Sequence, residues 1–359
     1  VLVSDLQPAV TGPEPAPGLA DMMAEYEETV EAATALRAAQ DSLEQLDRQG
    51  LGAQPADYRR IESLFQSQPS KPEPSRLFQL DLMKPARANL GRKVVNEIAR
   101  ALELLAELTP PIRNDPLERF RAAFHERYED REVPLVEALD DEIGIGFDAS
   151  QASESAPLLA GLKLGSPDWD GARWEERDRL LLHLVGNALR DGRRELELTP
   201  AEIEALATGR QPRLPDALEV VATVAAASQD ELDRGRFRVH LRYVFGAPGA
   251  RLLGRFCHAD RGLHDRIEQH LHLEEAQRAD AVFAEIVHLP EGRIGNILLR
   301  PVLRRYEIPF LARSGAPPQA QIPVTDLLVS AREGIASETG ERLVLRSRRL
   351  GCEVIPRLT

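Results

Sequence analysis

Cysteine is scarce in this chain, and its scarcity excludes two kinds of stabilisation. Only Cys257 and Cys352 occur among 359 residues. Two thiols cannot form the disulfide framework of a small secreted protein, nor a closed zinc site with four cysteine ligands. We therefore expect two free thiols in a protein of the reducing cytoplasm.

Long apolar runs are also missing. No segment approaches the roughly 20 consecutive apolar residues that cross a bilayer. The first residues, VLVSDLQPAVTG, have neither the basic start nor the apolar stretch of a signal peptide. Because they also lack an initiator methionine, we expect an internal fragment of a longer cytoplasmic protein.

No sequence pattern identifies a metal or a nucleotide cofactor. Four histidines fall close together, but they lack HxxxH spacing, and no cysteine or paired carboxylate completes a cage around them. These histidines are His258, His264, His270 and His272. The glycine-containing stretches GIGF and FGAPGARLLGRF match neither GxGxxG nor GxxxxGK[ST]. We expect no metal and no bound cofactor.

Net positive charge is absent as well. The formal charge is −13 and the pI is about 5.2, which excludes the overall basic surface of a protein that coats nucleic acid. The balance is uneven, because residues 1–75 hold 13 acidic and 5 basic side chains, whereas residues 285–359 hold 8 and 11. A local basic groove on an acidic body is compatible with this distribution.

The basic end of the chain contains a dense arginine stretch, GRIGNILLRPVLRRYEIPF at 292–310. Glu307 is the only acid between Arg293 and Arg313, so the stretch does not neutralise itself. Its apolar residues indicate a partly buried segment. Guanidinium groups bind both phosphate and carboxylate. Charge alone therefore supports two interpretations equally: a groove for a polyanion, or ion pairs with the acidic helices. The arginines of the expected groove are Arg293, Arg300, Arg304, Arg305, Arg346, Arg348 and Arg349.

Hydrophobic periodicity divides the chain into a helical first half and a strand-rich second half. It predicts helices over 19–48, 57–66, 84–108, 117–128 and 173–191, and a further helix capped by Thr199. It predicts strands within 216–228, 235–246, 281–289, 322–333 and 341–355, and one helix over 262–278. This order favours an α+β fold over an alternating parallel fold.

One acid lies where an apolar strand is predicted. In RLFQLDLMK, at 76–84, alternation places Leu80 and Leu82 on one face and Asp81 on the other. A carboxylate within a buried strand needs a partner. From this segment alone, a structural ion pair is the favoured interpretation.

A glycine-containing bend follows the strand predicted within 235–246. It carries Arg251 and Arg255 in FGAPGARLLGRF. Backbone N–H groups and guanidinium groups together suit a phosphate or carboxylate oxygen. A turn that merely needs positive φ is the alternative.

Several blocks, taken in order, resemble the amino-terminal domain of class I lantibiotic dehydratases. They are VLVSDLQPAVTG, FQLDL, FHERYEDREVPLVEALDDEIGIGF, GRFCHAD, AVFAEIVHLPEGRIGNILLRPVLRRYEIPFLARSG, IPVTDLLVSARE and LVLRSRRLGCEVIPRLT. The match is loose only from Gln151 to Leu214. The connection SAREGIASETGERLVLRS is longer than the tight turn of the family, which predicts a surface insertion.

This resemblance implies a tRNA-dependent enzyme. The family takes glutamate from glutamyl-tRNA and esterifies Ser or Thr side chains of a ribosomally made precursor peptide, and a separate domain then eliminates glutamate to leave dehydroalanine or dehydrobutyrine. The matching positions imply catalytic roles for Asp81, the acid of FQLDL, and Arg255, the arginine of the GRF turn. We expect contacts to the tRNA backbone from Arg251, Arg293, Arg300, Arg304 and Arg305.

The resemblance also implies an organisation and a set of partners. Residues 1–12 would be the exit of an upstream leader-peptide-binding module, and residues 13–359 an internal part of the glutamylation domain, with the elimination domain beyond. The expected partners are glutamyl-tRNA as co-substrate, the leader and core of the precursor peptide, a second copy in a homodimer, and the cyclase and transporter of the pathway. Binding to the cyclase and the transporter in a biosynthetic complex would place the protein at the periphery of the membrane.

Two other functions fit the same residues. A stand-alone relative of this fold would add an amino acid from aminoacyl-tRNA to the carboxyl end of a peptide, forming an amide. A non-catalytic peptide-binding scaffold would use Asp81 and Arg255 only as an ion pair. Transfer of glutamate from glutamyl-tRNA separates the scaffold from the enzymes.

Overall fold

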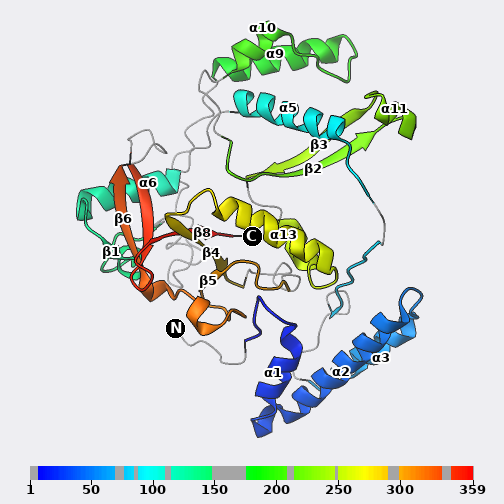
Figure 1. The fold of residues 1–359 in the computed structure, drawn as a ribbon, viewed down its shortest axis with the longest axis vertical. Helices are drawn as coiled ribbons and strands as arrows, with labels where there is room; N and C mark the ends of the chain where they lie inside the picture. Colours follow the sequence, from blue (N-terminus) through cyan, green and yellow to red (C-terminus); the bar gives the residue numbers. More distant parts are fainter. Residues whose placement is uncertain are drawn as a thin grey trace, which may run out of the picture.

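A computed structural model describes residues 7–68, 77–84, 88–109, 115–147, 175–207, 214–246, 250–289, 299–333 and 341–358 of the protein. Helices dominate the first half and strands the second (Figure 1), which confirms the predicted α+β class. The expected insertion after Glu333 lies outside the described residues, and so do residues 151–174 and 208–213 of the loosely matching section. In the described ranges, no helix combines the length and the apolar character that crossing a membrane requires.

The amino-terminal helices form an arm of their own (Figure 1). It contains α1 (Pro15–Met23), α2 (Val30–Gln49) and α3 (Pro55–Ser63). The prediction of one helix over 19–48 is wrong, because Tyr26 has extended backbone and the Thr29 hydroxyl donates to the Met23 carbonyl. A threonine hydroxyl that bonds local backbone competes with helix continuation.

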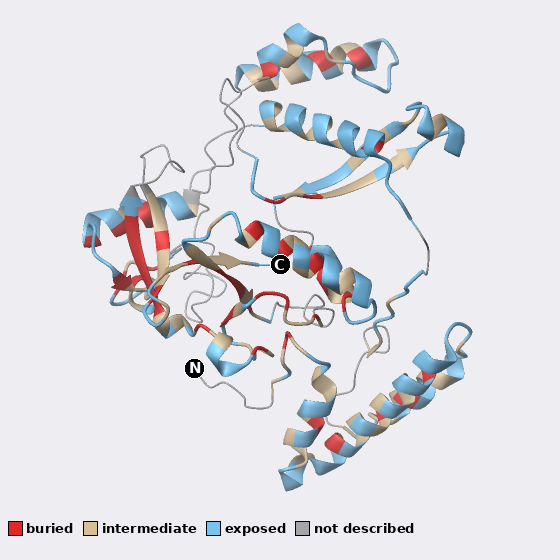
Figure 2. Ribbon diagram, viewed as in Figure 1, coloured by how far each residue is buried: buried red, intermediate tan, exposed pale blue. Residues whose placement is uncertain are grey.

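The centre of the fold is a six-stranded sheet. Its order is β1-β6-β7-β8-β4-β5; the pairs from β1 to β8 are antiparallel, and β4 is parallel to both β8 and β5. The strands are β1 (Val133–Pro134), β4 (Ala281–Val287), β5 (Tyr306–Pro309), β6 (Leu327–Glu333), β7 (Glu341–Ser347) and β8 (Glu353–Arg357). Strand β5 was missed in the sequence, because its four residues lie inside the arginine stretch, where no alternation is visible. Buried residues concentrate in this sheet (Figure 2).

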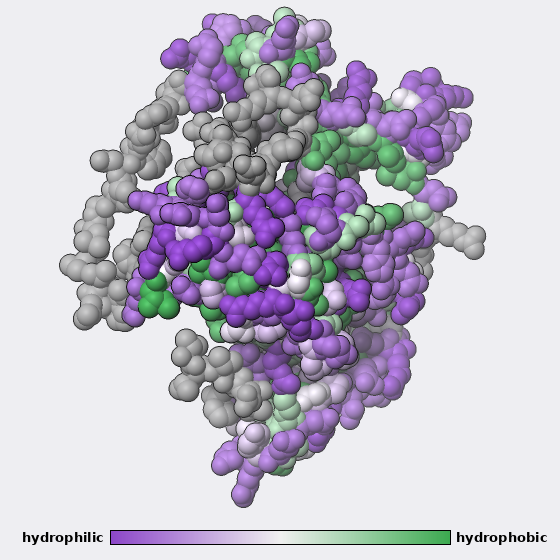
Figure 3. Space-filling model, turned by 60° about the vertical axis from the view of Figure 1, so that its left-hand side comes forward, coloured by the Kyte–Doolittle hydropathy of each residue, from purple (hydrophilic) through white to green (hydrophobic). Residues whose placement is uncertain are grey.

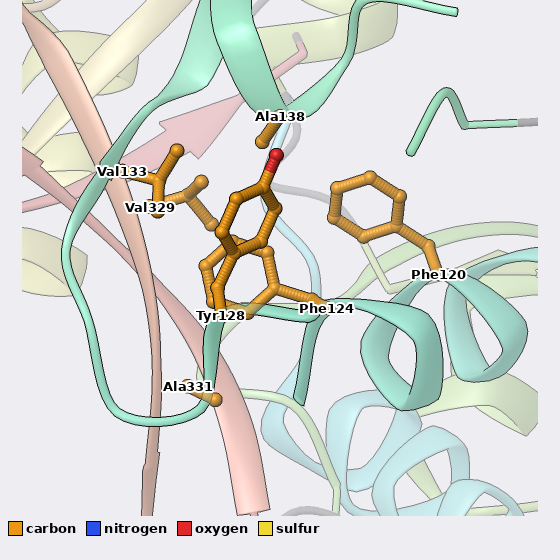
Figure 4. Packing of buried hydrophobic residues seen from close by; sticks show 7 residues of the cluster. All are labelled: Phe120, Phe124, Tyr128, Val133, Ala138, Val329 and Ala331. Atoms are coloured by element: carbon orange, nitrogen blue, oxygen red, sulfur yellow. The ribbon is translucent and has the colours of Figure 1, made fainter. Parts of the chain in front are cut away.

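An aromatic cluster packs one helix on the antiparallel part of the sheet (Figure 4). Phe120, Phe124 and Tyr128 project from α6 (Asp115–Tyr128) toward Val329 of β6. The rings of Phe124 and Tyr128 lie 5.0 Å apart, centroid to centroid. Burying each phenylalanine contributes roughly 1.5–3 kcal/mol. The short helix α7 (Leu135–Ala138) closes the same core through Ala138.

A second layer of helices and a hairpin lies apart from the sheet (Figure 1). It comprises α5 (Arg92–Leu108), α9 (Glu176–Arg190), α10 (Pro200–Leu206), β2 (Glu219–Ala225), α11 (Gln229–Asp233) and β3 (Arg238–Phe245). The predicted cap is confirmed, because the Thr199 hydroxyl accepts from the Glu202 amide. The apolar side chains of α5 are only partly buried: Val94 is inside, but Val95 and Leu105 are exposed. Hydrophilic residues cover most of the face drawn in Figure 3, with apolar patches between them.

Candidate functional site

Arg255 is held by a compact helical turn. It lies in the 3₁₀ helix Gly254–Phe256, between α12 (Ala250–Leu253) and α13 (Arg261–Glu275), whose first turn is capped by the Asp260 carboxylate. Residues 250–256 of the predicted glycine-containing bend are therefore helical, and residues 247–249 lie outside the described residues. Gly254 allows close packing rather than a positive φ, since a Cβ there would meet Leu303 Cδ1 at 3.3 Å.

The buried thiol of Cys257 stabilises the same turn. Cys257 Sγ donates to the Leu253 carbonyl at 3.6 Å and packs in a cluster with Leu271 and Leu303. Burial raises the pKa of this thiol, and the charge of Asp260 raises it further. Cys257 thus acts as a packed apolar group, as the sequence predicts.

Asp81 lies on an extended segment that is not a strand. Residues 78–84 pair with no strand in the described part of the chain, so the prediction of a buried strand is wrong. Leu80 and Leu82 are 72% and 68% exposed. The predicted alternation is nevertheless present, because the Asp81 side chain points the other way and is only 18% exposed. The segment orients an acid inward without burying its leucines.

The structure brings Asp81 and Arg255 together across 174 residues of chain. Arg255 Nη2 donates to Asp81 Oδ1, and Gln79 Nε2 donates to the same oxygen at 3.2 Å. The Arg255 guanidinium also lies 4.8 Å from the centroid of the Phe256 ring. Both charged side chains are about four-fifths buried. The Arg255 Nε is buried without a hydrogen-bond partner in the described residues, so the guanidinium keeps one donor free.

A cavity of about 600 Å³ has neither Asp81 nor Arg255 in its wall and is linked to the pair only through His258. His258, one turn after Arg255, lines the cavity together with Glu14 and Val302. The rest of its wall comes from Gly12, Pro13, Leu299, Pro301 and Gly315. His258 Nδ1 donates to the Arg255 carbonyl, which links the cavity wall to the ion pair. The volume falls within the range of small-ligand sites.

The amino-terminal residues complete the cavity by lying against residues before, within and after β5. The Thr11 hydroxyl donates to Glu307 Oε2 at 2.8 Å and accepts from the Gly315 amide at 3.0 Å. The Gly12 amide donates to the Arg300 carbonyl at 2.9 Å. Residue 315 must be glycine for this approach, because a Cβ there would lie 2.0 Å from the Thr11 carbonyl oxygen. Of the segment 1–12, residues 1–6 lie outside the described residues.

Two arginines of the 292–310 stretch are buried in ion pairs. Arg304, 1% exposed at its side chain, donates to Glu274 at 2.6 Å and to Glu275 at 2.8 Å. Arg300 donates to Glu285 on β4. These side chains are removed from the surface that an RNA backbone could contact. We therefore replace the expected tRNA contact at Arg300 and Arg304 with a structural role, the ion-pair interpretation.

The ion pairs of this network lower the pKa of the buried Glu274 carboxyl. Burial opposes ionisation of Glu274, but hydrogen bonds from Arg304 and Arg357 outweigh it and hold its pKa below the ordinary value. Arg357 Nε donates to Glu274 Oε1 at 2.9 Å. Three arginines and three glutamates therefore balance in one cluster: Arg300, Arg304, Arg357, Glu274, Glu275 and Glu285.

The other arginines of the stretch and of the bend do not share one environment. Arg305 is exposed and lies over the Tyr306 ring, 5.3 Å from its centroid. Arg251 lies over the Phe245 ring at 5.3 Å. Its charge opposes the desolvation that raises the pKa of the buried Glu219 carboxyl. Arg293 lies outside the described residues.

The arginines on the far side of the sheet are also partnered within the protein. Arg346 makes two hydrogen bonds to the Glu132 carboxylate, at 2.8 and 2.6 Å. Arg349 donates to the carbonyls of Gln319 and Gln321, each at 2.8 Å. The side chains of Arg346 and Arg349 thus serve local structure.

A second cavity, of about 570 Å³, shares no lining residue with the first. It lies between α6 and the strands β7 and β8, and Glu353 in its wall pairs with Arg278 and Arg342. The hydrogen bonds from Arg342 are the main cause of a lowered pKa at Glu353. The pairing of Glu353 with Arg278 and Arg342 makes these three charges less available to a ligand.

One histidine has acidic neighbours that the sequence argument did not count. His264, Asp265 and Glu268 of α13 each place a ligand atom within 4.8 Å of the others. Two carboxylates thus lie near His264, although they do not complete a cage around the histidines. Three residues of one helix, with Asp265 exposed to solvent, do not by themselves define a metal site.

His258 is the cavity residue that sequence reasoning assigned no role. The histidine cluster drew attention for its metal-binding side chains, whereas the informative feature is the spacing from Arg255. Three residues within helical turns place His258 and Arg255 on neighbouring positions.

Comparisons with known proteins give a consistent result. A family model described as "Lantibiotic dehydratase, N terminus" matches residues 1–359. The crystal structure of the tRNA dependent lantibiotic dehydratase MibB from Microbispora sp. 107891 is 27% identical, with a TM-score of 0.71 over 99% of this chain. The chain spans 34% of the length of MibB. A search of curated proteins found no match.

Structures of the TbtB glutamylation domain from thiomuracin biosynthesis are also similar. One, bound to 5'-phosphodesmethylglutamycin, is 22% identical with a TM-score of 0.34, covering 74% of this chain and 32% of that one. Another is 21% identical with a TM-score of 0.39, covering 92% and 40%.

Proposed function

Since the chain belongs to the lantibiotic dehydratase N-terminal family, we propose that it transfers glutamate from glutamyl-tRNA to Ser or Thr side chains of a ribosomally made precursor peptide. The transfer is the first step of dehydration in lanthipeptide biosynthesis or a related pathway. The similarity to MibB, a tRNA dependent dehydratase, supports this proposal over nearly the whole chain.

The observation that carries the proposal is the Asp81–Arg255 pair. Two residues far apart in sequence, singled out by their family positions, converge in one partly buried pair, and His258, three residues after Arg255, lines a cavity. Burying two paired charges gains little stability, so stability alone does not explain why this ion pair is largely buried. A site that binds both an ammonium and an anionic oxygen of the glutamyl group supplies a reason.

The chemistry asks little of the protein beyond alignment. An aminoacyl ester is already reactive, so binding the ester beside the hydroxyl and stabilising the developing oxyanion are the main tasks. We assign Arg255 to an anionic oxygen of the glutamyl group or of the terminal nucleotide's phosphate. Asp81 orients the glutamyl ammonium. Exposed Arg305 and Arg251 remain the described candidates for contacts to the tRNA backbone.

A transfer assay with the complete protein tests the proposal. Radiolabelled glutamyl-tRNA is mixed with the precursor peptide encoded beside the gene, and label on the peptide is measured. We expect label that neutral hydroxylamine removes, because it cleaves esters. Label that resists hydroxylamine indicates an amide and favours the peptide ligase. Because elimination releases the label and dehydrates the residue, absence of both label and dehydrated residues on the peptide favours the non-catalytic scaffold.

A further inference from the structure

The proposed transfer needs a group that accepts the proton of the peptide hydroxyl, and His258 is placed for that task. This inference rests on the proposed function. Asp81 is poorly suited, because its carboxylate is paired with the Arg255 guanidinium and its Oδ1 also accepts from Gln79. His258 lines the cavity of about 600 Å³ and contacts the backbone carbonyl of Arg255.

The hydrogen bond of His258 determines which ring nitrogen is available. A carbonyl oxygen can only accept, so Nδ1, which contacts the Arg255 carbonyl, carries the proton. In the neutral imidazole the other nitrogen, Nε2, then has a free lone pair. A backbone carbonyl that fixes the tautomer of a histidine in this way prepares its second nitrogen to accept a proton.

Charged groups lie near the imidazole. Glu14 lines the same cavity, Asp260 lies two residues further on, and the Arg255–Asp81 pair lies one turn back. Glycine at positions 12 and 315 lets these two segments of backbone lie against each other and form one side of the wall. The volume of about 600 Å³ is within the range of small-ligand sites, so we take the cavity as the place of the terminal ribose ester.

We propose that His258 Nε2 is the general base of glutamyl transfer. The Ser or Thr oxygen attacks the carbonyl carbon of the ester while Nε2 takes the hydroxyl proton. A new oxygen–carbon bond forms, the bond from that carbon to the ribose oxygen breaks, and the imidazolium returns the proton to the ribose oxygen. Atoms and charge balance without another reactant, and the imidazole is regenerated.

Two substitutions separate this role from a structural one. In His258→Asn the side-chain amide can still donate to the Arg255 carbonyl, but no base remains. We expect transfer by the complete protein to fall by about 100-fold or more, the usual effect of a general base. In His258→Ala, free imidazole should restore part of the lost rate. His272→Ala, an exposed position on α13, is the matched control and should neither lose activity nor respond to imidazole.

The outcomes are distinct. Wild-type transfer by His258→Asn overturns the proposal, and so does a slow His258→Ala variant that imidazole does not restore. A slow Asn variant together with a rescued Ala variant supports it. If the unmodified protein transfers no glutamate at all, the proposed function itself fails, a result that needs none of the variants.

Discussion

Arg304 offers the sharpest test of how the arginine stretch is used. Its guanidinium is 1% exposed and donates to Glu274 and Glu275, with Glu285 3.8 Å away. In Arg304→Met, the balanced cluster of three arginines and three glutamates is left with one excess negative charge. Removing one partner of a buried ion pair costs about 3–5 kcal/mol, because the remaining charge has no compensation.

The adjacent Arg305 provides a matched control. It is exposed and lies over Tyr306, so Arg305→Met should change the free energy of unfolding by no more than about 0.5 kcal/mol. Urea denaturation of both variants measures the difference. The double variant Arg304→Met with Glu274→Gln should cost less than the sum of its single changes, by about 1 kcal/mol, since it removes the stranded charge. Equal stability of the Arg304 and Arg305 single variants would refute the structural role of Arg304.

Three further predictions concern the cavity wall, the acid response and the buried thiol. Gly315→Ala should destabilise the protein by about 1–3 kcal/mol, because the new Cβ would lie 2.0 Å from the Thr11 carbonyl, whereas Gly186→Ala, with nothing within 4 Å, should not; equal denaturation midpoints would contradict this. Glu353 has a lowered pKa, so the stabilisation from its ionised carboxylate is present above its ordinary pKa of 4.5 and is lost as the pH falls below that value toward the folded-state pKa. Glu353→Gln should flatten the plot of unfolding free energy against pH in this range, and an unchanged slope would contradict the prediction. Cys257, buried and with a raised pKa, should react with iodoacetamide more slowly than Cys352 in the native protein and equally fast in urea; equal native rates would show that the thiol is accessible.

The elements that follow a local pattern were predictable. The strands β2, β3, β4, β6 and β7 and the capped helix after Thr199 lie within the expected segments, and β8 runs two residues past the expected end at 355. The break between α1 and α2 was not predictable from periodicity, because it depends on the backbone of Tyr26 and the hydroxyl of Thr29 rather than on apolar spacing. Strand β5 was hidden by its short length.

The site was only partly accessible from sequence. The pairing of Asp81 with Arg255 was an expectation that rested on family resemblance, and the structure brings the two side chains together. The number and sequence positions of the charges could not predict which arginines are exposed to solvent. Arg304 is buried, whereas the adjacent Arg305 is exposed. The cavity wall was invisible for a similar reason: it joins Gly12, His258 and Gly315, which only the tertiary fold brings together.

The most direct test of the central claim is single-turnover glutamyl transfer by Asp81→Asn, Arg255→Lys and the double variant, at equal fractions of folded protein. We expect each single variant to lose transfer by about 100-fold or more, and the double variant to be little worse than either, because residues that act as one unit are not additive. Transfer at the wild-type rate by both single variants would show that this pair only holds the fold together.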